Sequence, residues 1–404
     1  MTILSRVQRA IDSVPIIDLH THLFAPQFGS LNLWGIDELL TYHYLIAEVL
    51  RAKPNLNPEA FLSQTISDQA DQIWQTLFVE RAPISEACTG VCTVLSELSL
   101  DPAAQNLHDI RAWFQSQNPD QHLTRVLALA NIECVTMTND PFDPDESQFW
   151  QSQTPYDPRF LPVLRIDPLV NNFEITQTQI PGNSDPLTNA TNFIAASIDQ
   201  MHPRYMAVSL PYDFQYPGQD SRTEIFDKII LPACKKHNLP LALMIGTNRQ
   251  VNPRLGQAGD GIGTADLHSL ETLCRNHPEI TFVVTTLSRE NAQHLCVIAR
   301  KFANLKIFGC WWFMNNPSLI EEVTDLRFEL LGDTFIPQHS DARILEQLIY
   351  KWKHSREIIA KSLTKRFEAL EKAGRRVSDD EITATCQKLL RTNALDILET
   401  TSSS

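Results

Sequence analysis

The sequence lacks long apolar runs, internal repeats and low-complexity segments. In its 404 residues, no stretch approaches the roughly 18 consecutive apolar residues that a membrane helix needs. The N-terminal residues do not show the charged-then-apolar order of a signal peptide. We therefore expect a soluble protein with a cytoplasmic location.

Positive charge is also scarce. Lysine and arginine together number 34, against 48 aspartates and glutamates, so the formal net charge is −14 at pH 7. A strongly acidic chain is poorly suited to nucleic acid or to an anionic membrane surface. We expect neither partner, and an anionic small molecule would need a local basic or metal site.

Closely spaced cysteine motifs are absent. Of the eight cysteines, only Cys88 and Cys92 are close together, with three residues between them. That spacing fits neither a zinc knuckle nor a CxxC redox pair. Buried, reduced thiols are the expected state.

What the sequence does contain is a series of short apolar, β-branched runs separated by helix-like segments. This alternation predicts βαβ units and a parallel sheet. Eight such units are the number that closes a (β/α)8 barrel, also called a TIM barrel. The runs are Ile16–Leu19, Arg125–Val135, Leu161–Ile166, Tyr205–Leu210, Leu239–Ile245, Ile280–Thr286, Leu305–Trp311 and Thr334–Pro337.

The segment between the first and second runs is long and helix-like. Its helical patterns cover Asp37–Lys53, Pro58–Val79 and Asp101–Ser116. We predict one α/β barrel domain over residues 1–404, with a helical insertion over 35–124 that covers the barrel mouth and closing helices over 343–398. A separate small helical domain is the alternative for the insertion.

Two histidines end the first predicted strand. Residues i and i+2 of a strand point to the same face, so His20 and His22 project together at its carboxyl end, where barrel active sites lie. Two adjacent imidazoles make half of a divalent-metal site.

A second polar group follows the last predicted strand. If strand geometry continues there, His339, Asp341 and Arg343 share one face. Barrel closure brings Asp341 beside His20 and His22, which predicts a His-His-Asp metal site. The alternative is that Asp341 caps the helix expected to start near Arg343.

These features resemble the amidohydrolase superfamily. Its uronate (glucuronate) isomerases are the most similar branch, and the chain resembles a divergent group of them. The resemblance rests on His20-Thr21-His22, Thr41-Tyr42-His43-Tyr44, Gly309-Cys310-Trp311-Trp312-Phe313 and Ser340-Asp341-Ala342-Arg343, and it covers nearly the whole chain.

The resemblance implies an aldose-ketose isomerase. Such an enzyme interconverts D-glucuronate and D-fructuronate, or D-galacturonate and D-tagaturonate, through a cis-enediol. It implies one divalent metal ion, expected to be zinc, held by His20, His22 and Asp341. We also expect a homo-oligomer acting on a small-molecule hexuronate.

The other site residues follow from the same resemblance, each with a structural alternative. We expect Arg165 to hold the substrate carboxylate, although an ion pair with Asp167 or Asp341 would also explain it. Catalytic roles fall to Asp341, Tyr44, His43 and Arg343. The C2 base is either Asp341 or a Tyr44 of lowered pKa assisted by Arg343. Because a metal-bound carboxylate keeps little basicity, Tyr44 is favoured, and Asp341 would then serve ring opening or deprotonation of a hydroxyl. His43, Tyr44, Arg343 and Trp311 are also expected substrate contacts, with packing or a solvated surface as the alternatives.

Met244 departs from the family pattern. Typical members carry a histidine at this position of strand five, and a thioether can neither bind a hard metal nor carry a proton. The glycine-rich segment 256–263 lacks the Lys-Ser/Thr of a phosphate loop and is interpreted as a flexible loop that acts as a lid. A metal-dependent hydrolase such as a sugar lactonase, and a non-catalytic sugar-acid binding protein, are the alternative functions.

Overall fold

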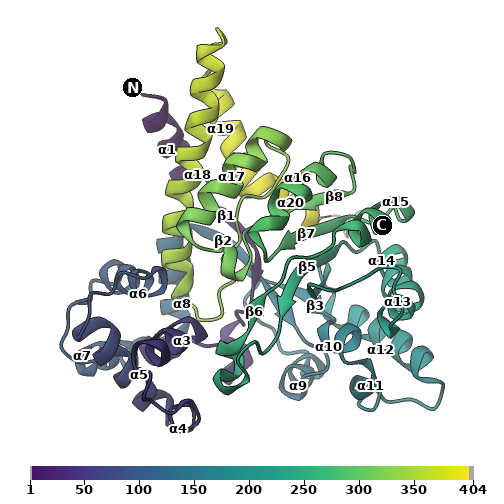
Figure 1. Cartoon of the computed structure of the whole chain (residues 1–404), viewed down its shortest axis with the longest axis horizontal. Coiled ribbons are helices and arrows are strands. Elements are labelled where there is room, and N and C mark those ends of the chain that lie inside the picture. Colours follow the sequence, from purple (N-terminus) through teal and green to yellow (C-terminus); the bar gives the residue numbers. More distant parts are fainter. Residues whose placement is uncertain (1, 400–404) are drawn as a thin grey trace.

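A barrel of parallel strands forms the centre of the molecule (Figure 1). The structure is a computed structural model and describes residues 2–399; residues 1 and 400–404 of the predicted domain lie outside the described residues. Seven strands pair in parallel, in the order β1-β2-β3-β4-β5-β7-β8. They are β1 (Ile16–Thr21), β2 (Ile132–Asn139), β3 (Phe160–Arg165), β4 (Met206–Pro211), β5 (Leu241–Asn248), β7 (Phe282–Thr286) and β8 (Leu305–Ile307). This confirms an α/β fold of the distorted (β/α)8 type.

The eighth run forms the barrel wall without becoming a regular strand. Ile336 makes a single parallel bridge to Phe308. Beyond it, Asp341 N donates to His20 O at 3.0 Å and His22 N donates to Ala342 O at 2.7 Å. The prediction of a strand over Thr334–Pro337 is thus wrong in its detail, because the segment joins β8 at one end and β1 at the other through isolated hydrogen bonds.

The second predicted strand was misplaced. Most of Arg125–Val135 belongs to a helix, α8 (Pro119–Ala130), because Asn118 caps its start and Asn131, at φ 51°, ends it in the left-handed conformation. The strand β2 follows directly. The apolar residues of α8 and β2 therefore form one run that periodicity alone did not divide.

The insertion contains more breaks than the sequence indicated. Asp37–Lys53 is split at Thr41 and Tyr42, where Tyr42 is extended, and Pro58–Val79 is split after Leu62. The helix expected over Asp101–Ser116 starts only at His108. The helices of this part of the chain are α2 (Ile36–Leu40), α3 (His43–Ala52), α4 (Pro58–Leu62), α5 (Ile66–Trp74), which continues as η2 (Gln75–Val79), α6 (Glu86–Glu97), α7 (His108–Gln115) and α8.

Outer helices surround the barrel, and Figure 1 shows α18 as the long helix that projects beyond the rest beside α1. The α18 helix starts at Gln347, later than the predicted Arg343. The remaining helices are α1 (Ile3–Ser13), α9 (Pro144–Ser152), α10 (Asp167–Asn171), α11 (Phe173–Thr176), α12 (Pro186–Met201), α13 (Ser221–Ile225), α14 (Leu231–His237), α15 (His268–Asn276), α16 (Ala292–Ala299), α17 (Pro317–Leu331), α18 (Gln347–Lys372), α19 (Asp379–Gln387) and α20 (Asn393–Leu398).

Alternation along the strands separates an inner from an outer core. Ile17 and Leu19 of β1 point into the barrel, whereas Ile16 joins the outer core. Ile397 and Leu398 of α20 pack against this inner core together with Cys134 and Leu161 near the starts of β2 and β3. The α20 helix therefore covers the end where the strands begin, and the opposite end remains for a site.

Candidate active site

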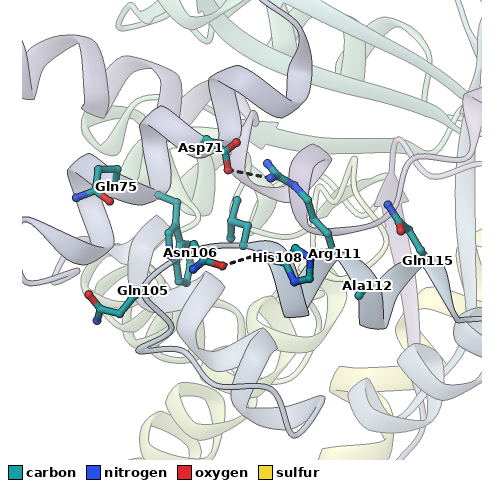
Figure 2. A pocket seen from close by; sticks show the side chains of 10 residues that line it. Asp71, Gln75, Gln105, Asn106, His108, Arg111, Ala112 and Gln115 are labelled. Atoms are coloured by element: carbon teal, nitrogen blue, oxygen red, sulfur yellow. Dashed lines mark hydrogen bonds and ion pairs between the residues drawn. The ribbon is translucent and has the colours of Figure 1, made fainter.

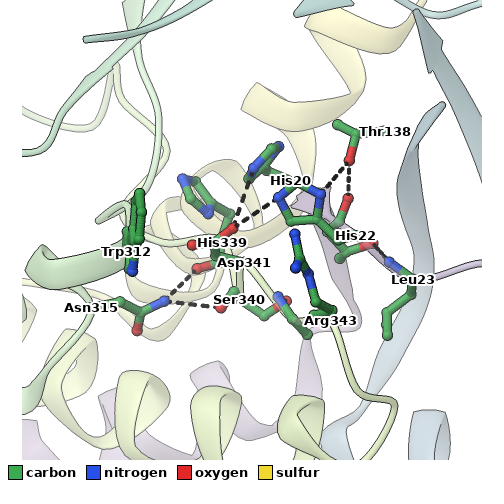
Figure 3. Close-up of polar contacts among 12 residues, drawn as sticks. His20, His22, Leu23, Thr138, Trp312, Asn315, His339, Ser340, Asp341 and Arg343 are labelled. Carbon is green, nitrogen blue, oxygen red and sulfur yellow. Dashed lines mark hydrogen bonds and ion pairs between the residues drawn. The ribbon is translucent and has the colours of Figure 1, made fainter. Parts of the chain in front are cut away.

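The carboxyl ends of the strands bring His20, His22 and Asp341 together (Figure 3). His20 Nε2 lies 3.3 Å and His22 Nε2 lies 3.6 Å from Asp341 Oδ1, and one ligand atom from each residue fits within 4.8 Å of the others. The helix-cap alternative for Asp341 is excluded, because the next helix, α18, begins only at Gln347.

The backbone near Asp341 holds this carboxylate in place. Asp341 adopts φ 53°, a left-handed conformation that is uncommon outside glycine. The preceding turn is fixed because the buried carboxylate of Asp18 accepts hydrogen bonds from Ser340 N at 3.1 Å and Trp352 Nε1 at 2.8 Å. Burial raises the pKa of Asp18.

The protonation of His22 follows from its hydrogen bonds. Thr138 Oγ1 donates to Thr21 O at 2.7 Å, so at 3.1 Å it accepts from His22 Nδ1–H. Burial, with the charge of Arg343, lowers the pKa of His22 well below its ordinary value. A neutral imidazole with its Nε2 lone pair toward Asp341 is the form that binds a metal ion.

The residues present fit a divalent metal. Both ring nitrogens of the buried His20 have no hydrogen-bond partner among residues 2–399, which is rare for buried polar atoms. Two imidazoles and one carboxylate are also a donor set that zinc accepts.

His339 does not share the face expected for it. Its ring is fully buried and contacts His20 with ring centroids 5.1 Å apart. It occupies space that a side chain on Gly309 would fill, since a Cβ there would lie 1.8 Å from the His339 ring. The segment is not a strand, so the predicted alternation fails.

A cavity of about 340 Å³ opens beside the His-His-Asp group. It is lined by His22, Tyr42, His43, Arg165, Ser209, Arg249, Gln257, Asp260, Trp311, Trp312, Asp341 and Arg343. Of the site residues predicted from the sequence, all but His20 and Tyr44 line this cavity. Met244 packs in the inner core of the barrel.

The three arginines of this cavity come from separate segments. Arg165 ends β3 and pairs with Asp167 at 3.3 Å, which raises the pKa of the guanidinium. Arg343 donates to Gln257 Oε1 at 3.2 Å. Sequence reasoning missed Arg249, although it directly follows β5, close to the position of Arg165 as the last residue of β3.

His43 lies at the start of α3 and faces Trp312. The Trp312 indole Nε1–H donates to His43 Nε2 at 2.9 Å, so a neutral His43 carries its proton on Nδ1. Burial, with the charges of Arg343, Lys351 and Arg249, lowers the pKa of His43 to about 3. His43 is therefore a neutral hydrogen-bond donor at ordinary pH.

The environment of Tyr44 contradicts the lowered pKa expected for it. Burial, with the negative charge of Asp341, raises the pKa of Tyr44 well above its ordinary value. Its ring packs against His43 and Phe313, with Lys351 Nζ 5.7 Å from the ring centroid. Tyr44 is thus a protonated phenol. It does not line the cavity, whereas Tyr42 does.

A second cavity, of about 540 Å³, lies within the insertion (Figure 2). Its lining comes from α5, α7 and the segment before α7. The charged side chains there, Arg111 and Asp71, pair with each other at 2.9 Å, and Arg111 also pairs with Asp37 at 2.9 Å.

No family model and no curated protein sequence matches the chain. Among solved structures, a uronate isomerase from Bacillus halodurans is 46% identical, with a TM-score of 0.94 over 98% of this chain and 96% of that one. A uronate isomerase from Thermotoga maritima and a glucuronate isomerase from Caulobacter crescentus share the fold at TM-score 0.78 each, with 14% and 13% identity over 98% of this chain and 97% and 94% of theirs.

The parallel barrel, with His20 near the end of β1, His22 directly after it and Asp341 after the last segment of the wall, defines a (β/α)8 protein with a candidate metal site at the carboxyl ends of its strands. The identity and coverage to the Bacillus protein show that the chain belongs to the uronate isomerase family. It is an enzyme, an isomerase. Within residues 2–399, no helix is long and apolar enough to cross a membrane.

Proposed function

We propose that the chain interconverts the open-chain aldehyde form of a hexuronate with its 2-keto isomer. The substrate pair is D-glucuronate and D-fructuronate, or D-galacturonate and D-tagaturonate. The supporting observation is the juxtaposition, in one cavity, of the Arg165 guanidinium with Asp341 and His22, which form the candidate metal site together with the buried His20. A guanidinium binds a carboxylate in two-point geometry, and the carboxylate and neutral donors nearby suit proton transfer at adjacent carbons.

The reaction moves protons without net oxidation. A base takes the C2 proton, the electron pair forms the C1=C2 bond of a cis-enediol, and the C1 carbonyl oxygen takes a proton. A proton then returns to C1 as the C2 hydroxyl loses its own. We assign removal of the C2 proton to Asp341. Its Oδ1 faces both imidazoles, so its Oδ2 is left to accept the proton.

Hydrogen-bond donors stabilise the oxygens that gain charge in the enediol. In this proposal His43 donates through Nδ1 and Arg343 through its guanidinium, while the protonated Tyr44 packs against the His43 ring. Trp311 forms an apolar wall. A divalent metal ion, expected to be zinc on His20, His22 and Asp341, would attract the substrate oxygens and offset their charge. The proposed architecture is one domain whose 35–124 insertion covers this site and whose 343–398 helices close the chain, with the protein acting as a homo-oligomer in the cytoplasm.

Proton NMR of the purified protein with each uronate in deuterated buffer tests the proposal. We expect 2-keto signals to appear and deuterium to enter the substrate, with turnover falling after chelation and in His22→Ala. An unchanged uronate would contradict the proposal. Turnover of a lactone would then identify a hydrolase, and binding alone would identify a sugar-acid binding protein.

Arg165→Ala tests the carboxylate anchor. We expect KM for the uronate to rise by roughly tenfold or more, with a smaller change in kcat, because a charge-assisted bond to bound substrate is lost. Arg222→Ala is the matched control, since Arg222 also pairs with an aspartate two residues away, Asp220, outside the cavity. Equal KM values in both variants would leave Arg165 with a structural role.

A further inference from the structure

One segment after β5 contributes three polar side chains to the cavity that the proposed reaction leaves unused. They are Arg249, Gln257 and Asp260. The segment folds back through a short helix, η4 (Pro253–Gly259), to β6 (Gly261–Ile262), which pairs antiparallel with β5. The η4 helix also packs against α3 and α4 of the insertion, so the segment joins the barrel to the insertion beside the cavity.

Two contacts position the half-exposed Arg249 side chain at the cavity wall. Its guanidinium forms an ion pair with Asp260, and its Cζ lies 5.3 Å from the centroid of a Trp312 ring. Asp260, whose side chain is only 7% exposed, also accepts a hydrogen bond from Gln250 N at 2.9 Å. A planar cation fixed by a carboxylate and an aromatic face loses little conformational freedom when it binds a ligand.

The chemistry of this pair differs from that of the other two arginines. A hexuronate has one carboxylate, which the proposed function assigns to Arg165, and the same proposal assigns Arg343, two residues after Asp341, to the enediol oxygens. The hydroxyl groups of the substrate each donate one hydrogen bond and accept others. An adjacent guanidinium and carboxylate supply both complements, a donor and an acceptor, at one place on the wall.

We propose that Arg249 and Asp260 bind hydroxyl groups of the substrate chain and thereby determine which hexuronate epimer the enzyme prefers. D-glucuronate and D-galacturonate differ only in the configuration of one hydroxyl group. A site that pairs a hydroxyl with a buried polar group, here the Asp260 carboxylate, discriminates against a substrate that leaves that group without the hydroxyl. This inference rests on the proposed function and adds the residues that select the substrate.

The same segment provides a matched control. Arg254 pairs with Glu59 of α4 at 3.5 Å, and both side chains lie outside the described lining of the cavity. Arg254→Met therefore removes an arginine–carboxylate contact from this segment without removing a group from the site. Comparison with Arg249→Met separates substrate contact from a loosened segment.

The experiment measures kcat and KM for both uronates in the wild type, Arg249→Met, Arg249→Lys, Asp260→Asn and Arg254→Met. We expect Arg249→Met to raise KM for the preferred epimer about tenfold or more and to change the ratio of the two kcat/KM values by about fivefold or more. Asp260→Asn should act in the same direction, Arg249→Lys should restore only part of the loss, and Arg254→Met should match the wild type. An unchanged epimer ratio in Arg249→Met, or an equal change in Arg254→Met, would overturn the inference.

Failure of the proposed function gives a different result. If the wild type turns over neither uronate, the proposed reaction is wrong, and titration calorimetry with D-glucuronate and D-galacturonate decides the role of Arg249. Weaker binding with an altered epimer preference in Arg249→Met alone supports it. Binding equal to that of the wild type, or absent from the wild type, refutes it.

Discussion

At the scale of single residues, hydrogen bonds fix the protonation of the site before any ligand binds. Thr138 sets His22 as an Nδ1–H tautomer, and Trp312 does the same for His43. Each imidazole is thereby left with one defined role: His22 presents a lone pair to Asp341, and His43 presents a proton. Preorganised donors of this kind stabilise charge without reorganising during the reaction.

Trp312→Phe tests the role of the indole. The variant keeps an aromatic ring but removes the Nε1–H that donates to His43, so His43 is free to change tautomer. We expect kcat for the uronate to fall about tenfold, as for loss of one positioned hydrogen bond. Nitrogen NMR of the His43 side chain should show a mixture of tautomers.

Trp113→Phe serves as the control for this substitution. Trp113 lies in α7 and, like Trp312, has an arginine over its ring, with Arg125 Cζ at 5.4 Å. The kcat of Trp113→Phe should equal that of the wild type. An unchanged His43 spectrum in Trp312→Phe would refute the tautomer argument.

At the scale of elements, close backbone approach sets the geometry of the barrel wall. Gly309 follows β8 at φ 63°, and a Cβ there would overlap the ring of His339, which packs against His20. Gly332, at φ 64°, has open space around the same position. Both glycines thus have a positive φ, which other residues rarely adopt, but only Gly309 has no room for a Cβ.

Substitution of these two glycines separates the two effects. Gly332→Ala should lower the free energy of unfolding by about 1–3 kcal/mol, because φ 64° with ψ −120° is a conformation that alanine rarely adopts. Gly309→Ala should lower the free energy of unfolding by about 3 kcal/mol or more, because the His339 ring must shift toward His20. The same shift should weaken zinc binding. Denaturant unfolding and zinc titration measure both, and equal losses would contradict the account.

A buried carboxyl beside β2 predicts a pH dependence of stability. Glu146 of α9 accepts hydrogen bonds from Asn139 Nδ2 and Asp140 N at 3.0 Å each, yet burial raises its pKa to about 8 from 4.5. The folded protein thus favours the protonated carboxyl. This contribution to stability is complete below pH 4.5 and is lost as the pH rises through 8.

Glu146→Gln should remove this contribution, since the amide oxygen accepts the same bonds and does not ionise. The wild type should lose stability relative to the variant between about pH 4.5 and 8, by up to a few kcal/mol at about 1.4 kcal/mol per pKa unit. Thermal unfolding of both proteins across this range is the measurement. Parallel curves would show that Glu146 ionises normally.

At the scale of the whole molecule, one buried carboxylate joins the insertion to the barrel. Glu346, just before α18, accepts from Gly35 N at 3.1 Å near the start of the insertion and pairs with His122 of α8 at 2.7 Å near its end. Both side chains are fully buried. The insertion that carries His43 is thus fixed at both ends by the segment that follows Asp341.

Glu346→Ala should therefore destabilise the protein strongly. Removing one partner of a buried pair leaves the other uncompensated, a loss of about 3–5 kcal/mol. Glu371→Ala, at an exposed position of α18, is the control and should be near neutral. Thermal unfolding and limited proteolysis of the insertion check this, and similar melting temperatures for the two variants would refute the role.

The barrel and the core of the site could be predicted from the amino-acid sequence. Periodic apolar runs indicate parallel strands, and the parity of a strand places His20 and His22 on one face, so these features are local. Asp341 followed from barrel closure, which joins the two ends of the barrel wall. The boundary between α8 and β2 was not predictable, because it depends on capping by Asn118 and Asn131 within one apolar run.

The full set of polar side chains that meet in the cavity, and their protonation states, depend on tertiary packing and could not be predicted from the sequence. Tyr44 is protonated because neighbouring elements bury it near Asp341, and Arg249 reaches the cavity because β6 folds its segment back along β5. Burial and charge around a side chain are set by residues distant in sequence. Spacing along the chain therefore predicts which residues share a face, whereas packing determines what each of them can do.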